Sequence, residues 1–105
     1  MEPDLNSKLS KYFEITAKAL RKVNVSGSLG KEGRKSAEDL LDLSKRYYED
    51  AKFFERKKDF VNAFGAVVYS HAFLDIGARI GLFDVDDDQL FMTDKKSPTT
   101  KNDFL

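Results

Sequence analysis

The residues best suited to chemistry in this sequence are His71, Asp75 and Arg79, which follow one another at steps of four. Steps of four stack side chains along one side of an α-helix. An arginine in such a row can hold a carboxylate or phosphate through its planar guanidinium group, and a histidine can donate or accept a proton near neutral pH. The spacing therefore predicts a small-anion or nucleotide site, which Tyr47 or Tyr48 from a neighbouring helix could complete.

The same three residues also have a structural interpretation. Asp75 and Arg79 can form an ordinary ion pair within one helix, which contributes only a few tenths of a kcal/mol. His71 stands among apolar residues, where a lone histidine is more often packed against one hydrogen-bond partner than catalytic. A metal site is disfavoured, because the chain has one histidine and no cysteine. The pattern favours the structural role and leaves the binding site as the alternative.

These residues belong to the most apolar stretch of the chain, residues 59–83, with the sequence DFVNAFGAVVYSHAFLDIGARIGLF. On a helical wheel, one apolar side contains Phe60, Ala63, Phe64, Val67, His71, Leu74, Ala78 and Leu82. The nearly opposite side contains Ala66, Tyr69, Phe73, Ile76 and Ile80. A helix that is apolar on two sides needs two partners. We therefore predict that residues 59–83 form the central helix of the fold, with Asp59 as its N-cap.

Two further helices are predicted to supply those partners. The first covers residues 4–23 and has one apolar stripe at steps of three and four, formed by Leu5, Leu9, Tyr12, Phe13, Thr16, Leu20 and Val23. The second covers residues 36–57, because Ser36 and Asp39 have the spacing of a capping box. The segment NVSGSLGKEGRK between them is typical of a loop, and a phosphate-binding role is disfavoured because no strand precedes it.

The short turn after residue 57 requires the second and third helices to be antiparallel. Counting outward from this turn places Ala51 opposite Gly65 and Tyr47 opposite Tyr69. Small residues that face each other allow two helix backbones to approach closely. The sequence therefore predicts a tight contact between these two helices.

Four blocks of the chain resemble a known family. They are YYEDAKFF from Tyr47, DFVNAF from Asp59, YSHAFLD from Tyr69 and GARIGLFD from Gly77. Together they resemble the small archaeal proteins grouped as domain of unknown function 357, over about half of the chain. The resemblance implies a three-helix bundle similar in architecture to a spectrin repeat, with no established biochemical activity. Helical periodicity and the resemblance both lead to an all-α, up-down-up three-helix bundle.

The length of the chain is that of one domain, which we predict to cover residues 1–92. After residue 83 the composition becomes acidic and polar, so residues 93–105 are predicted to be a disordered tail. Leu90, Phe91 and Met92 could fold back on the bundle as one short turn. The acidic run lacks the glycine and terminal glutamate of a calcium-binding loop, which favours a solvated segment.

The overall composition excludes several classes of function. Eighteen basic residues balance eighteen acidic ones, so the chain offers no net charge to attract nucleic acid or an anionic membrane. The absence of cysteine excludes disulfides and thiol catalysis. A ribonuclease of the helical toxin type would need an arginine a few residues before the histidine, but the nearest one before His71 is Arg56. With no long uninterrupted apolar run and no basic-then-apolar leader, we expect a cytoplasmic protein.

The sequence thus favours a non-enzymatic protein-protein interaction module without a cofactor. Val61, Val68 and Ala72 lie on an arc of the central helix that we expect to be exposed, where they could bind a second copy, giving a homodimer, or an unidentified protein partner. The alternative function is the small-anion or nucleotide site described above. A weaker alternative is RNA binding through a basic cluster formed by Lys52, Arg56, Lys57 and Lys58.

Overall fold

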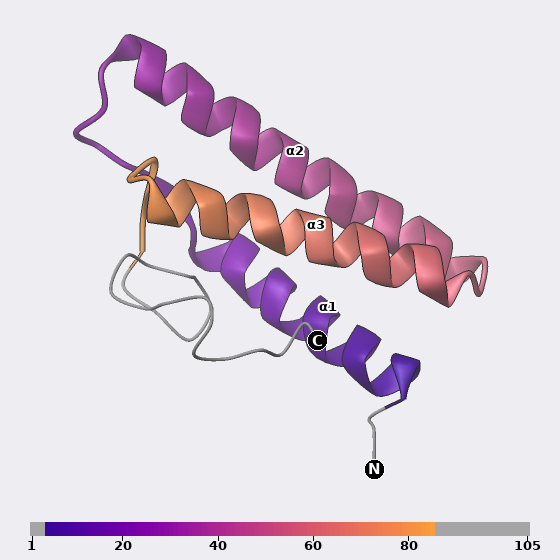
Figure 1. Ribbon diagram of the computed structural model, residues 1–105. Coiled ribbons are helices and arrows are strands. Elements are labelled where there is room, and N and C mark those ends of the chain that lie inside the picture. The colour runs from indigo at the N-terminus through magenta and orange to yellow at the C-terminus, as the bar shows by residue number, and fades with distance from the viewer. Residues whose placement is uncertain (1–3, 86–105) are drawn as a thin grey trace.

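The computed structural model describes residues 4–85, which form three helices and a small two-stranded sheet (Figure 1). In chain order the elements are α1 (Leu5–Lys22), β1 (Asn24–Val25), α2 (Lys31–Arg56), α3 (Phe60–Arg79) and β2 (Phe83–Asp84). The predicted all-α, up-down-up three-helix bundle is confirmed. The predicted domain end at residue 92, the turn at residues 90–92 and the disordered tail at residues 93–105 lie outside the described residues.

Helix α1 begins almost where the sequence predicts. The Asp4 carboxylate accepts a hydrogen bond of 2.8 Å from the backbone N–H of Ser7, which would otherwise lack a partner in the first turn. This backbone hydrogen bond lowers the pKa of the Asp4 carboxyl. Arg21 and Lys22 lie in the last turn, at the negative end of the helix dipole. The apolar stripe and both ends of α1 therefore agree with the prediction.

Helix α2 begins at Lys31, so the predicted start at Ser36 is wrong. Gly30 is the N-cap, and Ser36 is an exposed residue inside the helix. The segment before Ser36 is rich in Lys, Glu and Arg, which are good helix formers, and a single interior glycine does not stop such a helix. An ion pair between Arg34 and Glu38, one turn apart, further supports the first turns.

Helix α3 begins as predicted at its N-cap, Asp59. The Asp59 side chain accepts a hydrogen bond from the backbone N–H of Asn62. The turn between α2 and α3 includes Lys58, which adopts a left-handed conformation with a φ of 61°. This short turn makes α2 and α3 antiparallel neighbours, as the sequence predicts.

The predicted end of α3 at residue 83 is wrong, because the helix ends at Arg79. Gly81 has a φ of 85°, a left-handed conformation that glycine adopts without steric cost. The N–H of Leu82 then donates back to the carbonyl of Gly77 at 2.8 Å, and Gly81 donates to that of Ala78. These two bonds form the Schellman motif that commonly terminates helices.

The residues after this motif form β2, which pairs antiparallel with β1. Val25 is aligned with Phe83, and the N–H of Ser26 donates to the carbonyl of Leu82 at 2.9 Å. The sequence predicts a loop at β1 and a continuing helix at β2, so this pairing corrects both expectations. The ring of Phe83 is buried against Gly77, where a Cβ atom would overlap it. The pairing therefore fixes the start of the α1–α2 connection to the chain segment that follows α3.

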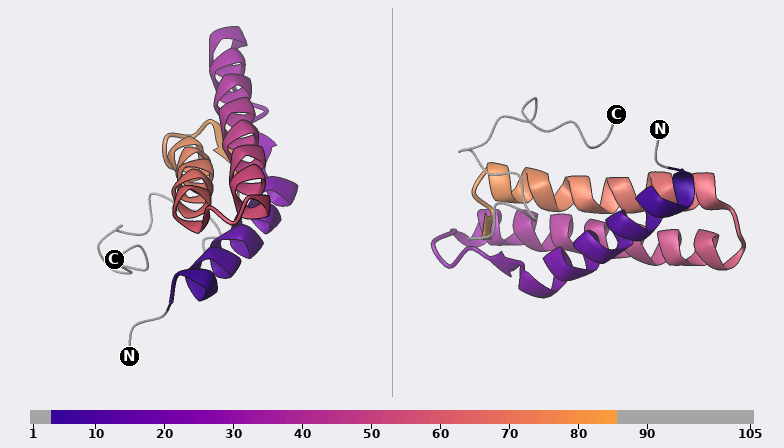
Figure 2. Two further views of the ribbon diagram at one scale, coloured as in Figure 1. Left: turned by 90° about the vertical axis from the view of Figure 1, so that its right-hand side faces the viewer. Right: turned by 90° about the horizontal axis from the view of Figure 1, so that it is seen from below.

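Helix α3 is the central element, with α2 alongside it and α1 crossing it on another side (Figure 2). The core contains residues of all three helices, including Leu9, Ala51 and Val67 in one cluster. A second cluster, at the end near the small sheet, surrounds the fully buried Leu74. The prediction that residues 59–83 contain the central helix is confirmed.

Candidate functional site

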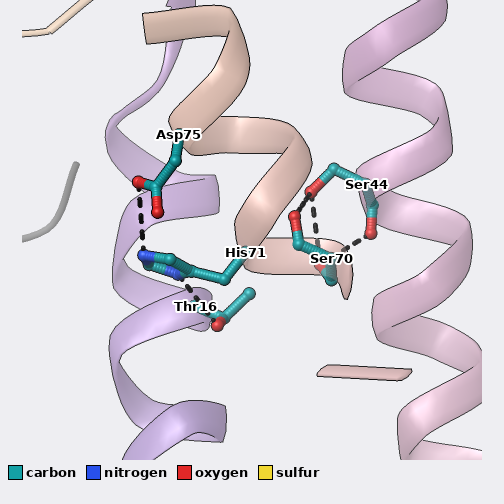
Figure 3. Close-up of polar contacts among 5 residues, drawn as sticks. All are labelled: Thr16, Ser44, Ser70, His71 and Asp75. Carbon is teal, nitrogen blue, oxygen red and sulfur yellow. Dashed lines mark hydrogen bonds and ion pairs between the residues drawn. The ribbon is translucent and has the colours of Figure 1, made fainter. Parts of the chain in front are cut away.

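His71 projects from α3 toward α1 and makes two polar contacts (Figure 3). Its Nδ1 atom lies 3.1 Å from the hydroxyl oxygen of Thr16, on α1. Its Nε2 atom lies 3.6 Å from a carboxylate oxygen of Asp75, one turn further along α3, which is an ion-pair distance when the imidazole is protonated. The Tyr12 ring packs nearby, nearly perpendicular to the imidazole, with the ring centroids 6.5 Å apart. The histidine is only 5% exposed.

This geometry favours the structural role of His71. Both nitrogens of its ring face protein atoms, and little of the ring reaches solvent. A general acid or base must come within hydrogen-bond distance of its substrate, and a ring buried between two helices offers no such position. The contact instead links α1 to α3, because a buried polar group is costly unless it is hydrogen-bonded.

The structure does not bring the five predicted site residues together. Arg79 is exposed in the last turn of α3, two turns or about 12 Å along the axis from His71. The ring of Tyr47 packs instead against Tyr69 on α3, with the centroids 5.5 Å apart. This contact confirms the predicted pairing of Tyr47 with Tyr69. Tyr69 and His71 point about 200° apart around α3, so Tyr47 lies on a different side of this helix from His71.

Tyr48 lies between α1 and α2. Its ring packs edge-on against Phe13 of α1, with the centroids 5.7 Å apart. Burial raises the pKa of the Tyr48 phenol, and the negative charges of Glu49 and Glu55 act in the same direction. Tyr48 also lines an open groove of about 370 Å³ together with Leu20, Arg21, Lys45 and other residues of α1 and α2. It is therefore part of the α1–α2 contact.

The basic cluster lies at the end of α2 and in the turn after it. The ammonium of Lys52 lies 5.5 Å from the centre of the Tyr48 ring and 3.8 Å from the Glu49 carboxylate. The ammonium of Lys57 lies 5.7 Å from the centre of the Phe53 ring. Within residues 4–85, no group of three or more His, Asp or Glu side chains has an arrangement that could hold a metal ion.

A polar contact that the sequence analysis missed joins α2 to α3. Ser44 donates to the backbone carbonyl of Ser70 at 2.8 Å, and Ser70 donates to that of Ser44 at 2.7 Å (Figure 3). Both residues are fully buried. Such short reciprocal bonds require the two backbones to be close. A signal was present in the sequence, because small residues recur every seven positions on both helices, as Ala37, Ser44 and Ala51 and as Ala63, Ser70 and Gly77.

This contact corrects the other half of the predicted register between α2 and α3, the pairing of Ala51 with Gly65. Gly65 was expected opposite Ala51, but Gly65 is exposed and a Cβ atom added there would meet nothing within 4 Å. Ala51 instead shares a buried cluster with Ala63. The expected close approach of the two helices is therefore made by a different set of small residues.

The side of α3 turned away from α1 and α2 is apolar. We call it the outer α3 face, formed by Val61, Gly65, Val68, Tyr69, Ala72, Ile76 and Ile80. Four large side chains on this face are well exposed: Val61 at 72%, Ile80 at 64%, Tyr69 at 60% and Ile76 at 48%. Of the arc predicted to be exposed, Val61 is well exposed, whereas Val68 and Ala72 are half-buried.

The prediction that Tyr69, Ile76 and Ile80 lie on a second covered side is wrong. Contacts to α2 run through Ser70, and those to α1 run through His71, so the two partners cover neighbouring sides of α3. Successive residues in a helix differ by about 100° around its axis. A broad part of the circumference therefore remains without a described helix or strand packed on it.

These features define a small all-α protein built around one apolar helix. A family model described as "Protein of unknown function (DUF357)" matches residues 11–83. The chain belongs to this family, which confirms the resemblance predicted from the sequence. Searches of curated proteins and of solved structures found no match.

Among residues 4–85, α3 is the one helix long and apolar enough, by length and composition, to cross a membrane. Its most apolar stretch of 18 residues has a mean hydropathy of 1.2, and a third of that stretch is buried inside the protein. The core helix of a globular protein has the same properties. The apolar residues of α3 fall into two groups: some pack against α1 and α2, and the others lie on its exposed outer face.

Proposed function

We propose that this protein is a non-enzymatic interaction module that binds another polypeptide through the outer α3 face. The observation that supports the proposal is the exposure of four large apolar side chains on one side of one helix. Monomeric proteins rarely expose a contiguous apolar patch larger than a few hundred Å², and larger patches mark interaction sites. Burying this surface against a partner would remove it from water.

The exposed sides of the other helices differ from this face. On α1 an exposed ion pair joins Glu14 to Lys18, and on α2 another joins Asp42 to Arg46. This is the usual composition of a solvated helix surface. The seven residues of the outer α3 face include no charged side chain and so form no such pairs. Contact with water alone therefore does not explain why these positions are apolar.

Aromatic residues beside the face add to this support. The ring of Tyr47 lies 5.5 Å from the rings of both Tyr69 and Phe73, centre to centre. These three side chains form an aromatic cluster at the edge of the face. Tyrosine and phenylalanine are enriched at protein interfaces because they bury a large area with little loss of side-chain freedom.

The other functions considered from the sequence have less support. An anion or nucleotide site would need the imidazole of His71 near solvent, and that ring is buried between α1 and α3. RNA binding would need cations available to phosphate groups, and the ammonium of Lys52 already lies near Glu49. We therefore keep the interaction module as the leading function.

The proposal is tested by photo-crosslinking in cells that naturally contain the protein. Tyr69 is replaced by a benzoylphenylalanine, which keeps an aromatic ring at the position. The control carries the same group at Arg46, an exposed position in an ion pair on α2. We expect intermolecular adducts from position 69 and none, or far fewer, from position 46.

Mass spectrometry of the adducts decides the outcome. An adduct between two polypeptides at position 69 supports the interaction module, whether the second polypeptide is another protein or another copy. Adducts only within the same chain, for example to residues 86–105, would reject the proposal. Equal adducts from both positions would mean unspecific contact and would also reject it.

A further inference from the structure

We infer that the polypeptide bound by the outer α3 face is a second copy of this chain, with its α3 antiparallel to the first. This inference rests on the proposed function and goes further by naming the partner. Three observations support it: the symmetric order of residues along the face, an exposed glycine within it, and its area and charge.

The outer α3 face is complementary to itself. In a twofold-symmetric pair, each residue of one copy meets the residue at the mirrored position of the other. With the axis passing α3 beside Tyr69, Val61 of each copy would meet Ile76 of the other. Gly65 would meet Ala72, so that small residues face small ones. The two Tyr69 side chains would lie next to each other at the centre, where the energetically important aromatic residues of interfaces are concentrated.

Gly65 is the second observation. It lies in the N-terminal half of α3, inside the helix, it is exposed, and a Cβ atom would have open space around it. A glycine inside a helix makes the protein less stable than an alanine would, and no described contact within the chain requires a glycine here. A glycine on an exposed apolar face permits a close approach of a second backbone. Opposite Ala72 of another copy, it would serve the same purpose as Ser44 and Ser70 in the α2–α3 contact.

The area of the face predicts a weak dimer. Stable interfaces bury about 800 Å² on each partner, from roughly 20–30 residues. The face has seven residues on one helix about 30 Å long, so it falls short of that size by itself. Leu43, which is 41% exposed, and Tyr47 lie on α2 and can extend it. We therefore expect a monomer–dimer equilibrium on the order of micromolar concentration rather than an obligate dimer.

The charges around the face allow such a pairing and predict how its strength depends on salt. The chain has a formal net charge of zero, so two copies do not repel each other as a whole. Arg79 would come near the other copy's α2–α3 turn, which contains Lys57, Lys58 and Asp59 and is positive on balance. Screening of this repulsion by added salt should strengthen the dimer.

Single cysteines test the arrangement cleanly, because the chain has no cysteine of its own. Tyr69→Cys places the two thiols next to the axis, so mild oxidation should give a disulfide-linked dimer. Val61→Cys places its two thiols about 22 Å apart, too far for a disulfide. An equimolar mixture of Val61→Cys and Ile76→Cys should give the mixed disulfide in preference to either symmetric one. Arg46→Cys, on the charged side of α2, measures the rate of random collisions.

The outcomes separate the possible partners. Fast crosslinking of Tyr69→Cys and of the mixture, with Val61→Cys at the collision rate, supports the antiparallel dimer. Fast symmetric crosslinking of Val61→Cys indicates a parallel pair and overturns the inference. Collision rates for all variants, together with sedimentation of the cysteine-free chain as a monomer at all accessible concentrations, also overturn it. Circular dichroism of each variant checks that the helices are intact.

Ile76→Lys provides a test that does not depend on thiols. Ile76 is half exposed, so the fold should tolerate the change, while a lysine opposite Val61 of the other copy should abolish the dimer seen in sedimentation. Flotation with phosphatidylcholine vesicles is measured in parallel. Loss of the dimer supports the inference, whereas vesicle binding that Ile76→Lys abolishes, without any dimer, would identify a lipid surface as the occupant and overturn it. If no dimer forms but photo-crosslinking at position 69 captures another protein, the interaction module stands and only the second copy is rejected.

Discussion

The two covered sides of α3 are built by different means. Toward α2 the contact uses small residues and two reciprocal serine bonds, both within 2.8 Å. Toward α1 it uses large rings, since Tyr12 packs edge-on against Phe64 at 5.6 Å between centroids. The polar contact between Thr16 and His71 on this side is longer, at 3.1 Å. Helix α3 thus packs closely against α2 through small residues, and packs against α1 through large side chains that fill the space between the two helices.

This difference determines how each contact should respond to mutation. A tight contact has no spare volume, so it should be sensitive to added atoms. A contact made by large side chains should be sensitive to their removal, because the surroundings relax only partly around a cavity. Mutations can test this difference: added volume should destabilise the α2–α3 contact, and removed volume should destabilise the α1–α3 contact.

The largest effect is expected where both contacts and the small sheet meet. Leu74 is fully buried in a cluster with Ala19 of α1, Ala37 of α2 and Phe83 of β2. Leu74→Ala removes a large side chain from a packed core and should reduce the free energy of unfolding by roughly 2–5 kcal/mol. Chemical denaturation measures the change. A loss below about 0.5 kcal/mol would mean that this cluster is not a packed core.

The next effect tests the tight contact. Ser70→Val adds volume where α2 and α3 are closest, and overpacking of this kind costs about 1–3 kcal/mol. Ser70→Ala is the matched control, since it removes the same hydroxyl without adding volume and should cost about 0.5–1.5 kcal/mol. The difference between the two variants, measured by urea unfolding, isolates the effect of volume. Equal stability of both would show that the two backbones are not tightly packed.

Helical periodicity was sufficient to predict most of the fold, because three of its features are local. The stripe on α1, the cap at Asp59 and the short α2–α3 turn each depend on neighbouring residues. The start of α2 was missed because glycines spaced three apart resemble a loop, although Gly33 lies inside the helix. The β1–β2 pairing was missed because strands of two residues have no periodicity, and Val25 and Phe83 are far apart in sequence.

The candidate site shows a limit of the same reasoning. The step of four between His71 and Asp75 is local, and the structure has these two side chains close together. Thr16 is 55 residues away, so its contact with His71 depends on how α1 crosses α3. The pattern also showed that α3 has apolar residues on several sides, but not which sides α1 and α2 cover. Tyr69 was assigned to a covered side for that reason.

The third prediction concerns the polar contact on the α1 side. His71→Ala leaves a cavity and a buried Thr16 hydroxyl without this partner, which should cost on the order of 1–3 kcal/mol. Thr16→Val removes the other partner with little change of shape. If the contact is structural, the double variant should cost less than the sum of the single ones, by about 0.5–1.5 kcal/mol. Strict additivity would show that the two side chains do not stabilise each other.

The smallest effect has the opposite sign and concerns two glycines on different sides of α3. Gly65 is exposed with open space at its Cβ position, so Gly65→Ala should raise the free energy of unfolding by about 0.5–1 kcal/mol. Gly77→Ala is the control, because a Cβ atom there would overlap the buried ring of Phe83 and should destabilise the protein. Both variants are measured by thermal unfolding at low concentration, where a weak dimer is dissociated. Destabilisation by Gly65→Ala would show that its side of α3 is already occupied within the monomer, and that the outer α3 face is not available to a partner.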